Sequence, residues 1–477
     1  MVDGHVFHGR RVIFTSVPVI TIGNIAEVVT KAVSVHLQNR GEIDYLYNYY
    51  KGKQPILGRV KDIRPEICNK IVVNRANEIV TFKSSYLVGE PVQYINRAGS
   101  GDNDSIEKLN WYMAGEDKDS KDEELSDWMH ICGTAYRMVT PNSEHSCADE
   151  SPFHIYTLDP RDTFVVYYSG LGHKPLISVN AIVTEDNEVL YACYTEKFYC
   201  EVLNGKVSNV LNNEIGMIPV VEYPLNEARL GAFEIVLPLL DAINETASNR
   251  MDGVEQFIQA LLVLKGVDIE SDDFAKLKEM GGLKVPADGD VQYLIQELNQ
   301  STTQTLIDDQ YETVLTICGM PNRNGGTSTS DTGSAVIFRD GWSSAESRAK
   351  HTEKMFSASE RKFLKIALQI AASIQNCSLN LKLSDIDIRF TRRNYEAIQT
   401  KSQVLTTMLS CMKIHPRLAF ESCGMFADPE RAYNMSEEYA EEQEKKLQEQ
   451  MSIEAGDDDG NGSSDGRTES AGEESEV

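Results

Sequence analysis

The acidic pair Asp308 and Asp309 is the first place where residue types could support chemistry. Two neighbouring carboxylates can hold a divalent metal or act as general acid and base. On a helix, however, such a pair usually forms a solvated face, and we favour that interpretation. A second pattern, GSSDG at 462–466, matches the nucleophile elbow GxSxG, but that motif needs a preceding strand and a strained turn. The surrounding Gly, Ser, Asp and Glu residues predict neither.

Motifs for cofactors and metals are absent from the sequence. There is no GxxxxGK[ST] loop, no HExxH and no GxGxxG, and none of the nine His pairs with Cys or His at metal-ligand spacing. The nine Cys are odd in number, irregularly spaced and without a CxxC pair, which indicates reduced thiols rather than a disulfide framework. We therefore expect a protein that is not an enzyme and has no cofactor and no metal.

Charge limits the surfaces that this chain can bind. The 477 residues include 46 Lys and Arg against 73 Asp and Glu, a formal net charge of -27. Broad neutralisation of nucleic-acid phosphates or of an anionic membrane needs a basic surface, so both are disfavoured. No apolar run reaches the length of a membrane span, and the first eleven residues lack a signal-peptide core. Residues 452–477 contain few apolar side chains and are predicted to be disordered.

The first half of the chain has a mixed α and β pattern. Residues 42–50 and 69–87 have helical periodicity, whereas the ten acids and three bases in 102–127 predict an exposed loop. Strand signals dominate 153–223, and Asn204-Gly205 between apolar segments predicts a hairpin.

The second half is predominantly helical. Long helices are predicted over 232–264, 301–318 and 335–375, and further helices over 396–412 and 429–451. Between the first two helices, residues 265–298 form a compact αβ insertion, and 320–334 form a loop rich in Gly, Ser and Thr. IDIRF at 386–390 alternates like a strand.

Three blocks occur in an order that is typical of one family. Residues 69–94 hold an Asn-rich helix followed by YLxGxPxxY, residues 218–257 hold PVxxY and then LLDAxN, and residues 319–338 hold a Gly- and Ser-rich loop before a long helix. Together these blocks resemble the portal proteins, or head-to-tail connectors, of long-tailed bacteriophages. The resemblance covers about residues 40–450.

The resemblance implies an α+β fold with named parts. These are an N-terminal arm over 1–40 that the family does not place, a wing over 41–231, a first stem helix over 232–264, a clip over 265–298, a second stem helix over 299–318, a tunnel loop over 319–335, a long wing helix and strand over 336–394, crown helices over 395–451 and a disordered acidic tail over 452–477.

The function implied by the family is a dodecameric ring at one capsid vertex, through which double-stranded DNA is packaged and ejected. The implied partners are further copies of the chain, the terminase large subunit, a head-tail adaptor, and the major capsid and scaffolding proteins, with no membrane. The implied location is the virion, with host cytoplasm during assembly.

Specific residues follow from these parts. In a ring, acids on the two stem helices would line the channel and repel DNA phosphates. The channel candidates are Glu234, Asp241, Glu245, Asp252, Glu255, Asp308, Asp309 and Glu312. The tunnel-loop candidates are Asn322, Arg323, Asn324, Gly325, Gly326, Thr327 and Ser328. The candidates for docking of the motor or adaptor at the clip are Asp272, Asp273, Lys276, Lys278 and Glu279.

Two alternatives stay open at this point. A phage-encoded nuclease would need carboxylates that converge around a metal and would cleave DNA with Mg²⁺ or Mn²⁺. Another head-assembly adaptor module would be monomeric, which separates it from a ring by size.

Overall fold

The computed structural model divides the chain into two compact units, residues 1–393 and 394–477. It describes residues 9–456 apart from 98–102, 146–149, 259–260, 266–289, 295–299, 323–340, 375–376, 378, 380, 393–397 and 427–428. Helices and strands are mixed in the first unit, which confirms the predicted mixed fold, while the described part of the second unit is helical.

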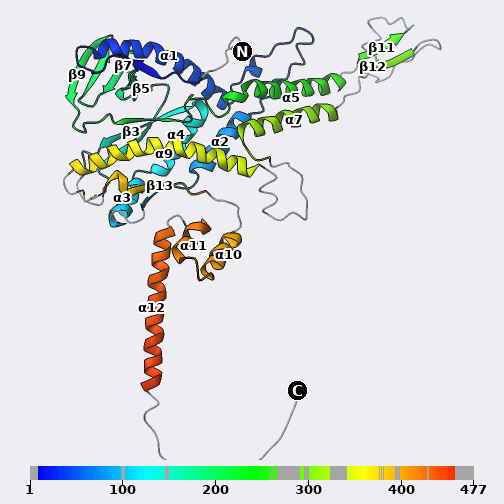
Figure 1. The fold of residues 1–477 in the computed structure, drawn as a ribbon. Helices are drawn as coiled ribbons and strands as arrows, with labels where there is room; N and C mark the ends of the chain where they lie inside the picture. The colour runs from blue at the N-terminus through cyan, green and yellow to red at the C-terminus, as the bar shows by residue number, and fades with distance from the viewer. Residues whose placement is uncertain are drawn as a thin grey trace, which may run out of the picture. The chain divides into compact units, whose positions relative to one another are not determined.

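A six-stranded sheet forms one layer of the first unit (Figure 1). Its order is β1 (Ile13–Thr15), β5 (Thr163–Tyr168), β6 (Pro175–Val183), β7 (Val189–Tyr194), β8 (Phe198–Leu203) and β9 (Lys206–Asn212). Only β1 is parallel to its neighbour, and the other pairs are antiparallel. Asn204 and Gly205 both have positive φ at the β8–β9 turn, which confirms the predicted hairpin.

Helix α1 (Ile25–Tyr50) connects two hydrophobic cores. Its first half, including Ile25 and Val29, packs on the six-stranded sheet. Its second half, including Leu46 and Tyr49, enters the larger core. The predicted helix over 42–50 is therefore only the end of a longer one, and residues 25–40 belong to a folded helix rather than to an arm.

The larger core lies around a three-stranded sheet with the order β10 (Val220–Pro224), β3 (Thr134–Pro141) and β4 (Phe153–Leu158). Helices α2 (Arg75–Val88), α4 (Lys118–Cys132) and α9 (Trp342–Ser373) supply apolar residues to the same core. A two-stranded sheet pairs β2 (Gln93–Asn96) with β13 (Ile386–Arg389), as the alternation of IDIRF predicts for the latter.

The region 102–127 corrects a prediction, because it is not an exposed loop. It forms α3 (Asn103–Gly115) and the first part of α4. Lys118 Nζ lies 2.5 Å from Asp122 Oδ2 and 3.0 Å from Glu360 Oε1, and all three side chains are buried. Arg137 completes this ion-pair cluster by bonding Asp122 and Glu360. The high charge of the segment is therefore matched by partners that are distant in sequence.

Two long helices, α5 (Leu237–Ile258) and α7 (Gln300–Cys318), lie side by side (Figure 1). Beyond α5, strand β11 (Leu261–Lys265) pairs with β12 (Asp290–Leu294). The predicted helix over 232–264 is thus wrong at both ends. Residues 234–236 form a short 3₁₀ turn, η2, and the last four residues of the predicted helix, 261–264, belong to β11.

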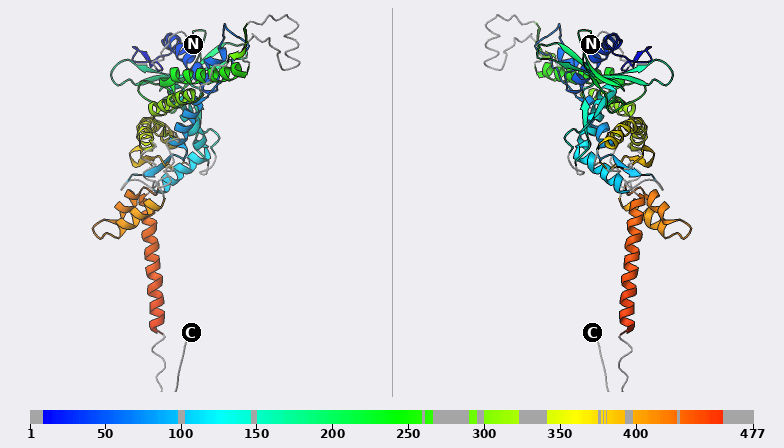
Figure 2. Two further views of the ribbon diagram at one scale, coloured as in Figure 1. Left: turned by 90° about the vertical axis from the view of Figure 1, so that its right-hand side faces the viewer. Right: turned by 90° about the vertical axis from the view of Figure 1, so that its left-hand side faces the viewer.

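The second unit holds α10 (Ile398–Leu409), α11 (Pro416–Cys423) and α12 (Pro429–Gly456). The long helix α12 is continuous through 28 residues (Figure 2). Its first helical residue is Pro429, as predicted, because a missing N–H costs nothing there. The predicted disordered tail lies outside the described residues, except that α12 continues to Gly456.

Candidate functional site

Seven of the eight acids predicted to line the channel lie on helices α5 and α7. The eighth, Glu234, lies in the 3₁₀ turn η2 just before α5. Each helix buries one apolar side in the larger core, through Leu240 and Ile243 on α5 and through Val314 and Leu315 on α7. The sides that do not enter this core differ in burial between the two helices. The acids consequently fall into a buried group and an exposed group.

Glu234 belongs to the buried group and cannot line a channel, which corrects the prediction. Its Oε1 lies 2.6 Å from Arg10 Nη2, and its Oε2 accepts a hydrogen bond from the backbone N–H of Gly231 at 2.8 Å. Burial raises the pKa of Glu234, although the Arg10 guanidinium opposes this. Its role is to hold the N-terminal segment against the turn before α5.

Asp252 is the second buried acid, and it too is wrongly predicted as a channel residue. Its Oδ2 lies 2.9 Å from Arg59 Nη1 and 3.0 Å from Lys61 Nζ, and its Oδ1 accepts the backbone N–H of Asn69 at 2.7 Å. Burial alone would raise the pKa of Asp252, but the hydrogen bonds from Asn69 and Lys61 and the charge of Arg59 lower it to about 2.

Asp252 is one step of a regular ladder along α5. Asn244 Oδ1 accepts the N–H of Val73 at 2.7 Å, and Ser248 Oγ accepts the N–H of Ile71 at 3.0 Å. Four residues of helix rise about 6 Å, and two residues of extended chain rise about 6.6 Å, so the two repeats match. Residues 69–73 are therefore an extended strap bonded along α5. This corrects the prediction of a helix over 69–87, since α2 begins only at Arg75.

Three further α5 acids have intermediate or exposed positions. Asp241 is partly buried and accepts a hydrogen bond from Tyr49 Oη at 2.9 Å. Burial raises the pKa of Asp241. Glu255 is partly exposed and Glu245 is exposed. Of the five predicted acids near α5, Glu245 is the one with an exposed side chain.

The three acids of α7 are all exposed. Asp308 Oδ1 accepts a hydrogen bond from Gln304 Nε2 at 2.7 Å, and Glu312 Oε1 accepts one from Asn322 Nδ2 at 3.2 Å. Asp308 and Glu312 are four residues apart and share a helix face, whereas Asp309 lies on a different one. Because α7 contains no Lys or Arg, these carboxylates form an acidic surface.

The end of α7 is held by contacts that the sequence did not indicate. Lys83 Nζ donates to the carbonyl of Cys318 at 2.7 Å, and burial lowers the pKa of Lys83. Gly319 has a φ of 65°, and a Cβ atom there would meet the Arg348 side chain at 2.3 Å. The chain therefore leaves α7 in a fixed direction. Asn322 is the last residue described before 341, and the other tunnel-loop candidates and all five clip candidates lie outside the described residues.

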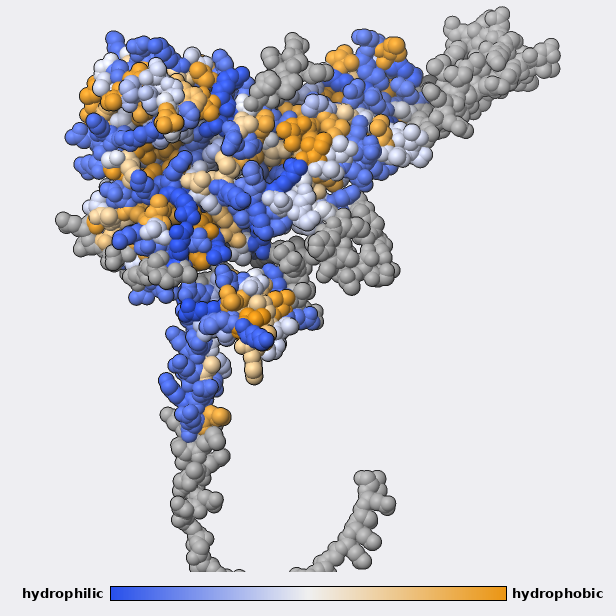
Figure 3. All heavy atoms as spheres, viewed as in Figure 1, coloured by the Kyte–Doolittle hydropathy of each residue, from blue (hydrophilic) through white to orange (hydrophobic). Residues whose placement is uncertain are grey.

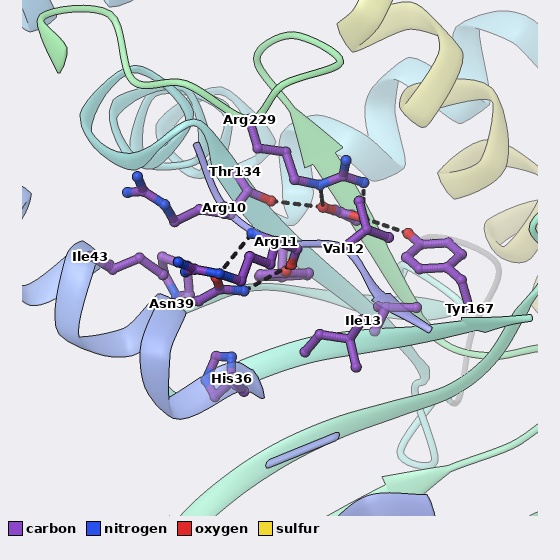
Figure 4. A pocket seen from close by; sticks show the side chains of 14 residues that line it. Arg10, Arg11, Val12, Ile13, His36, Asn39, Ile43, Thr134, Tyr167 and Arg229 are labelled. Atoms are coloured by element: carbon purple, nitrogen blue, oxygen red, sulfur yellow. Dashed lines mark hydrogen bonds and ion pairs between the residues drawn. The ribbon is translucent and has the colours of Figure 1, made fainter. Parts of the chain in front are cut away.

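A small hollow beside the N-terminal segment is filled by ion pairs (Figure 4). Glu222 accepts hydrogen bonds from Arg229 Nε at 2.6 Å, Tyr167 Oη at 2.5 Å and Thr134 Oγ1 at 3.1 Å. Burial alone would raise the pKa of Glu222, but the hydrogen bond and charge of Arg229 and the hydrogen bonds from the Tyr167 and Thr134 hydroxyls lower it. This arrangement joins strands of the two larger sheets and leaves the carboxylate engaged by three protein partners.

The described residues contain neither a metal-binding cluster nor a membrane-spanning helix. That part of the chain contains no group of three or more His, Cys, Asp or Glu residues placed to hold a metal ion. None of the described helices is long and apolar enough to cross a membrane.

Comparisons with known proteins agree on one family. A sequence model described as "Phage portal protein, SPP1 Gp6-like" matches residues 31–450. The "Portal protein" of Bacillus phage SPP1 is 24% identical over 277 residues, which is 52% of this chain, and the chain spans about half the length of that curated relative.

Two solved structures are also similar. One belongs to the "Neck of empty GTA particle computed with C6 symmetry", with a TM-score of 0.44 and 10% identity over 74% of this chain and 90% of that one. The other is the "Virion of native gene transfer agent (GTA) particle", with a TM-score of 0.44 and 10% identity over 81% of this chain and 94% of that one. From the family match over residues 31–450, the chain belongs to the SPP1 Gp6-like family of phage portal proteins.

Proposed function

We propose that this chain is the subunit of a ring at one vertex of a phage capsid, and that double-stranded DNA enters and leaves through the ring. The observation that carries the proposal is the family match over residues 31–450, which includes both units of the chain. The protein acts as a passage and a platform, so the work of packaging comes from a separate motor. Twelve copies in the ring are part of the proposal.

The proposal assigns each part of the portal to elements of this fold. The stem is α5 and α7, and the clip is the segment 265–298, which begins at the last residue of β11 and includes β12. The tunnel loop follows Cys318, where Lys83 and Gly319 fix the direction of the chain. The sheets with α1 to α4 and α9 form the wing, and α10 to α12 form the crown. The clip would contact the terminase large subunit and later a head-tail adaptor, and the wing would contact capsid and scaffolding proteins.

Four of the eight channel candidates have exposed side chains, and we retain three of them, because Asp309 lies on a different face of α7 from Asp308 and Glu312. Asp308 and Glu312 share one face of α7, and Glu245 is exposed on α5. Like charge repels the DNA phosphates, and this keeps the duplex centred. A basic lining would hold DNA by counterion release and would oppose passage. The solvated acidic face that the sequence favours for Asp308 therefore suits a channel.

Two experiments test the proposal. Electron microscopy and native mass spectrometry of the purified chain should show one closed cyclic oligomer, and a monomer at micromolar concentration would contradict the proposal. In a packaging assay, the Asp308→Lys/Glu312→Lys variant should form rings but package DNA more slowly, and more so at low salt. The matched control is Glu421→Lys on the exposed surface of α11. Equal packaging by wild type and the double variant would remove the channel role from these acids.

A further inference from the structure

The loop between α1 and α2 exposes apolar side chains that the described part of the chain leaves uncovered. Val60 is 81% exposed, Ile63 is 80% exposed and Leu57 is 45% exposed. Hydrophobic side chains are visible on this loop, beside α5, in the space-filling view (Figure 3). Contiguous exposed apolar residues of this kind mark interaction surfaces.

The loop is fixed in place, although its apolar side chains face away from the protein. Arg59 and Lys61, on either side of Val60, both bond Asp252 of α5, and Arg59 Nη1 also donates to the carbonyl of Asn69 at 2.9 Å. The residues at 59 and 61 thus point toward α5, while the residue between them points outward. A rigid apolar surface loses little conformational entropy when it binds.

A second exposed surface, with an apolar side chain near each end, lies on α7. Leu306, Asp309, Thr313 and Ile317 follow one another at intervals of three and four residues, so they form one stripe along the helix. All four are exposed, Leu306 by 48% and Ile317 by 40%. We call this set the α7 stripe.

The loop and the α7 stripe lie on opposite sides of the helix pair. On α5, Ser248 bonds the strap while Arg250 bonds Gln304 of α7, and residues two apart point about 200° apart around a helix. On α7, Gln304 faces α5, so Leu306 points away from α5 by the same rule. Across the helix pair, the loop therefore lies on the outer side of α5, and the α7 stripe lies on the outer side of α7. Figure 1 shows the loop on the side of α5 that faces away from α7.

We propose that the loop of one subunit packs against the α7 stripe of the neighbouring copy in the ring. This inference rests on the proposed function, and it identifies one contact that closes the ring. A rotational ring needs two different, complementary surfaces on opposite sides of each subunit. Here each surface contains exposed apolar side chains, and the charges around them are opposite. Besides Arg59 and Lys61, which bond Asp252, residues 51–70 contain four basic and two acidic residues, whereas α7 contains three acidic residues and no basic one. Arg64, which follows Ile63 and lies 3.6 Å from Glu66 of its own chain, is the basic residue that would meet Asp309 of the next copy.

The first experiment measures ring formation by the full-length chain in native mass spectrometry. Wild type should form a ring, and Val60→Glu/Ile63→Glu and Leu306→Glu/Ile317→Glu should each be folded by circular dichroism but monomeric. Leu171→Glu, on another fully exposed leucine of the wing, is the matched control and should retain the ring. Normal rings of Val60→Glu/Ile63→Glu would overturn the contact, and so would equal loss of the ring in Leu171→Glu.

The second experiment adds no charge to either surface and uses a thiol-specific cross-linker. The Val60→Cys/Leu306→Cys variant should give a ladder of covalent oligomers in a denaturing gel, and each single variant should give no ladder beyond the background from the exposed Cys411. Rings without a ladder overturn the proposed contact and leave the portal function standing. A monomeric wild-type chain, by contrast, contradicts the portal function itself.

Discussion

Helices α5 and α7 lie side by side and are both acidic, but their acids do different work. On α5, the Asp252 carboxylate is buried and accepts hydrogen bonds from Arg59, Lys61 and Asn69. On α7, Asp309 and Glu312 are exposed. The difference lies in what covers each helix, since the strap at 69–73 lies along α5 and α7 presents an uncovered side. The role of a carboxylate on a long helix therefore depends on what packs against that side of the helix, and the neighbouring residues in the sequence do not determine it.

The largest expected difference between the helices comes from Asp252→Ala. This change leaves Arg59, Lys61 and the Asn69 N–H without their buried partner, and we expect a loss of about 3 kcal/mol in the free energy of unfolding. Urea unfolding followed by circular dichroism measures it. The matched control is Asp309→Ala on α7, which should change stability by less than about 0.5 kcal/mol. Equal effects would mean that the contrast between the helices is wrong.

The pH dependence of the stability that Asp252 contributes gives a second test of the contrast between the buried acid of α5 and the exposed acids of α7. The folded-state pKa of Asp252 is lowered to about 2 from an ordinary value near 3.8, so its stabilising contribution is present above pH 4. This contribution is lost as pH falls through about 2, when the carboxylate becomes protonated in both states. The stability gap between wild type and Asp252→Asn should thus be full at pH 7 and shrink between pH 4 and 2. A constant gap over that range would contradict the ionic role.

The ladder itself predicts an intermediate effect. In Ser248→Ala the Ile71 N–H loses its acceptor in a partly buried position, so unfolding should become easier by about 1 kcal/mol. Hydrogen exchange of the Ile71 amide should also speed up. Glu245→Ala, on the exposed side of the same helix, provides the comparison and should leave both the stability and that amide unchanged. Slow exchange at Ile71 in Ser248→Ala would show that the strap does not depend on this bond.

The smallest expected effect on stability is at the exposed acids of α7. Asp308→Asn/Glu312→Gln should shift the melting temperature by no more than a degree or two, because exposed charges contribute little to folding. Differential scanning calorimetry measures this shift. A large loss of stability would show that these acids support the fold, and their channel role would then need another basis.

Predictions from the sequence succeeded where the signal was local. The strands in 153–223 are rich in β-branched and aromatic residues, Asn204-Gly205 fits a turn with positive φ, and the helix at 301–318 matches α7 within one residue. The family resemblance also held, because it depended on the order of short blocks. The exposed acids of α7 were correctly placed on a helix for the same local reason.

The failures have a common cause, which is pairing between residues far apart in the sequence. The charged segment 102–127 looked solvated, yet Lys118 and Asp122 are buried with Glu360 and Arg137. The buried face of α1 includes the polar residues His36 and Asn39, which bond the backbone of Arg161 and Arg11, so the apolar pattern of this helix is interrupted. Likewise, nothing near Glu234 indicated that Arg10, 224 residues earlier, would bury it.

By itself, the sequence determined the mixed fold, the long helices, the acidic charge and membership of the portal family, because these depend on composition, local periodicity and short motifs. Only the tertiary structure decided which acids are buried, that residues 69–73 form a strap on α5, and which sides of the helix pair remain uncovered. A buried ionised group needs compensating partners, and those partners come from strands and loops that folding brings together. The face that a helix exposes is likewise set by what packs on its other sides.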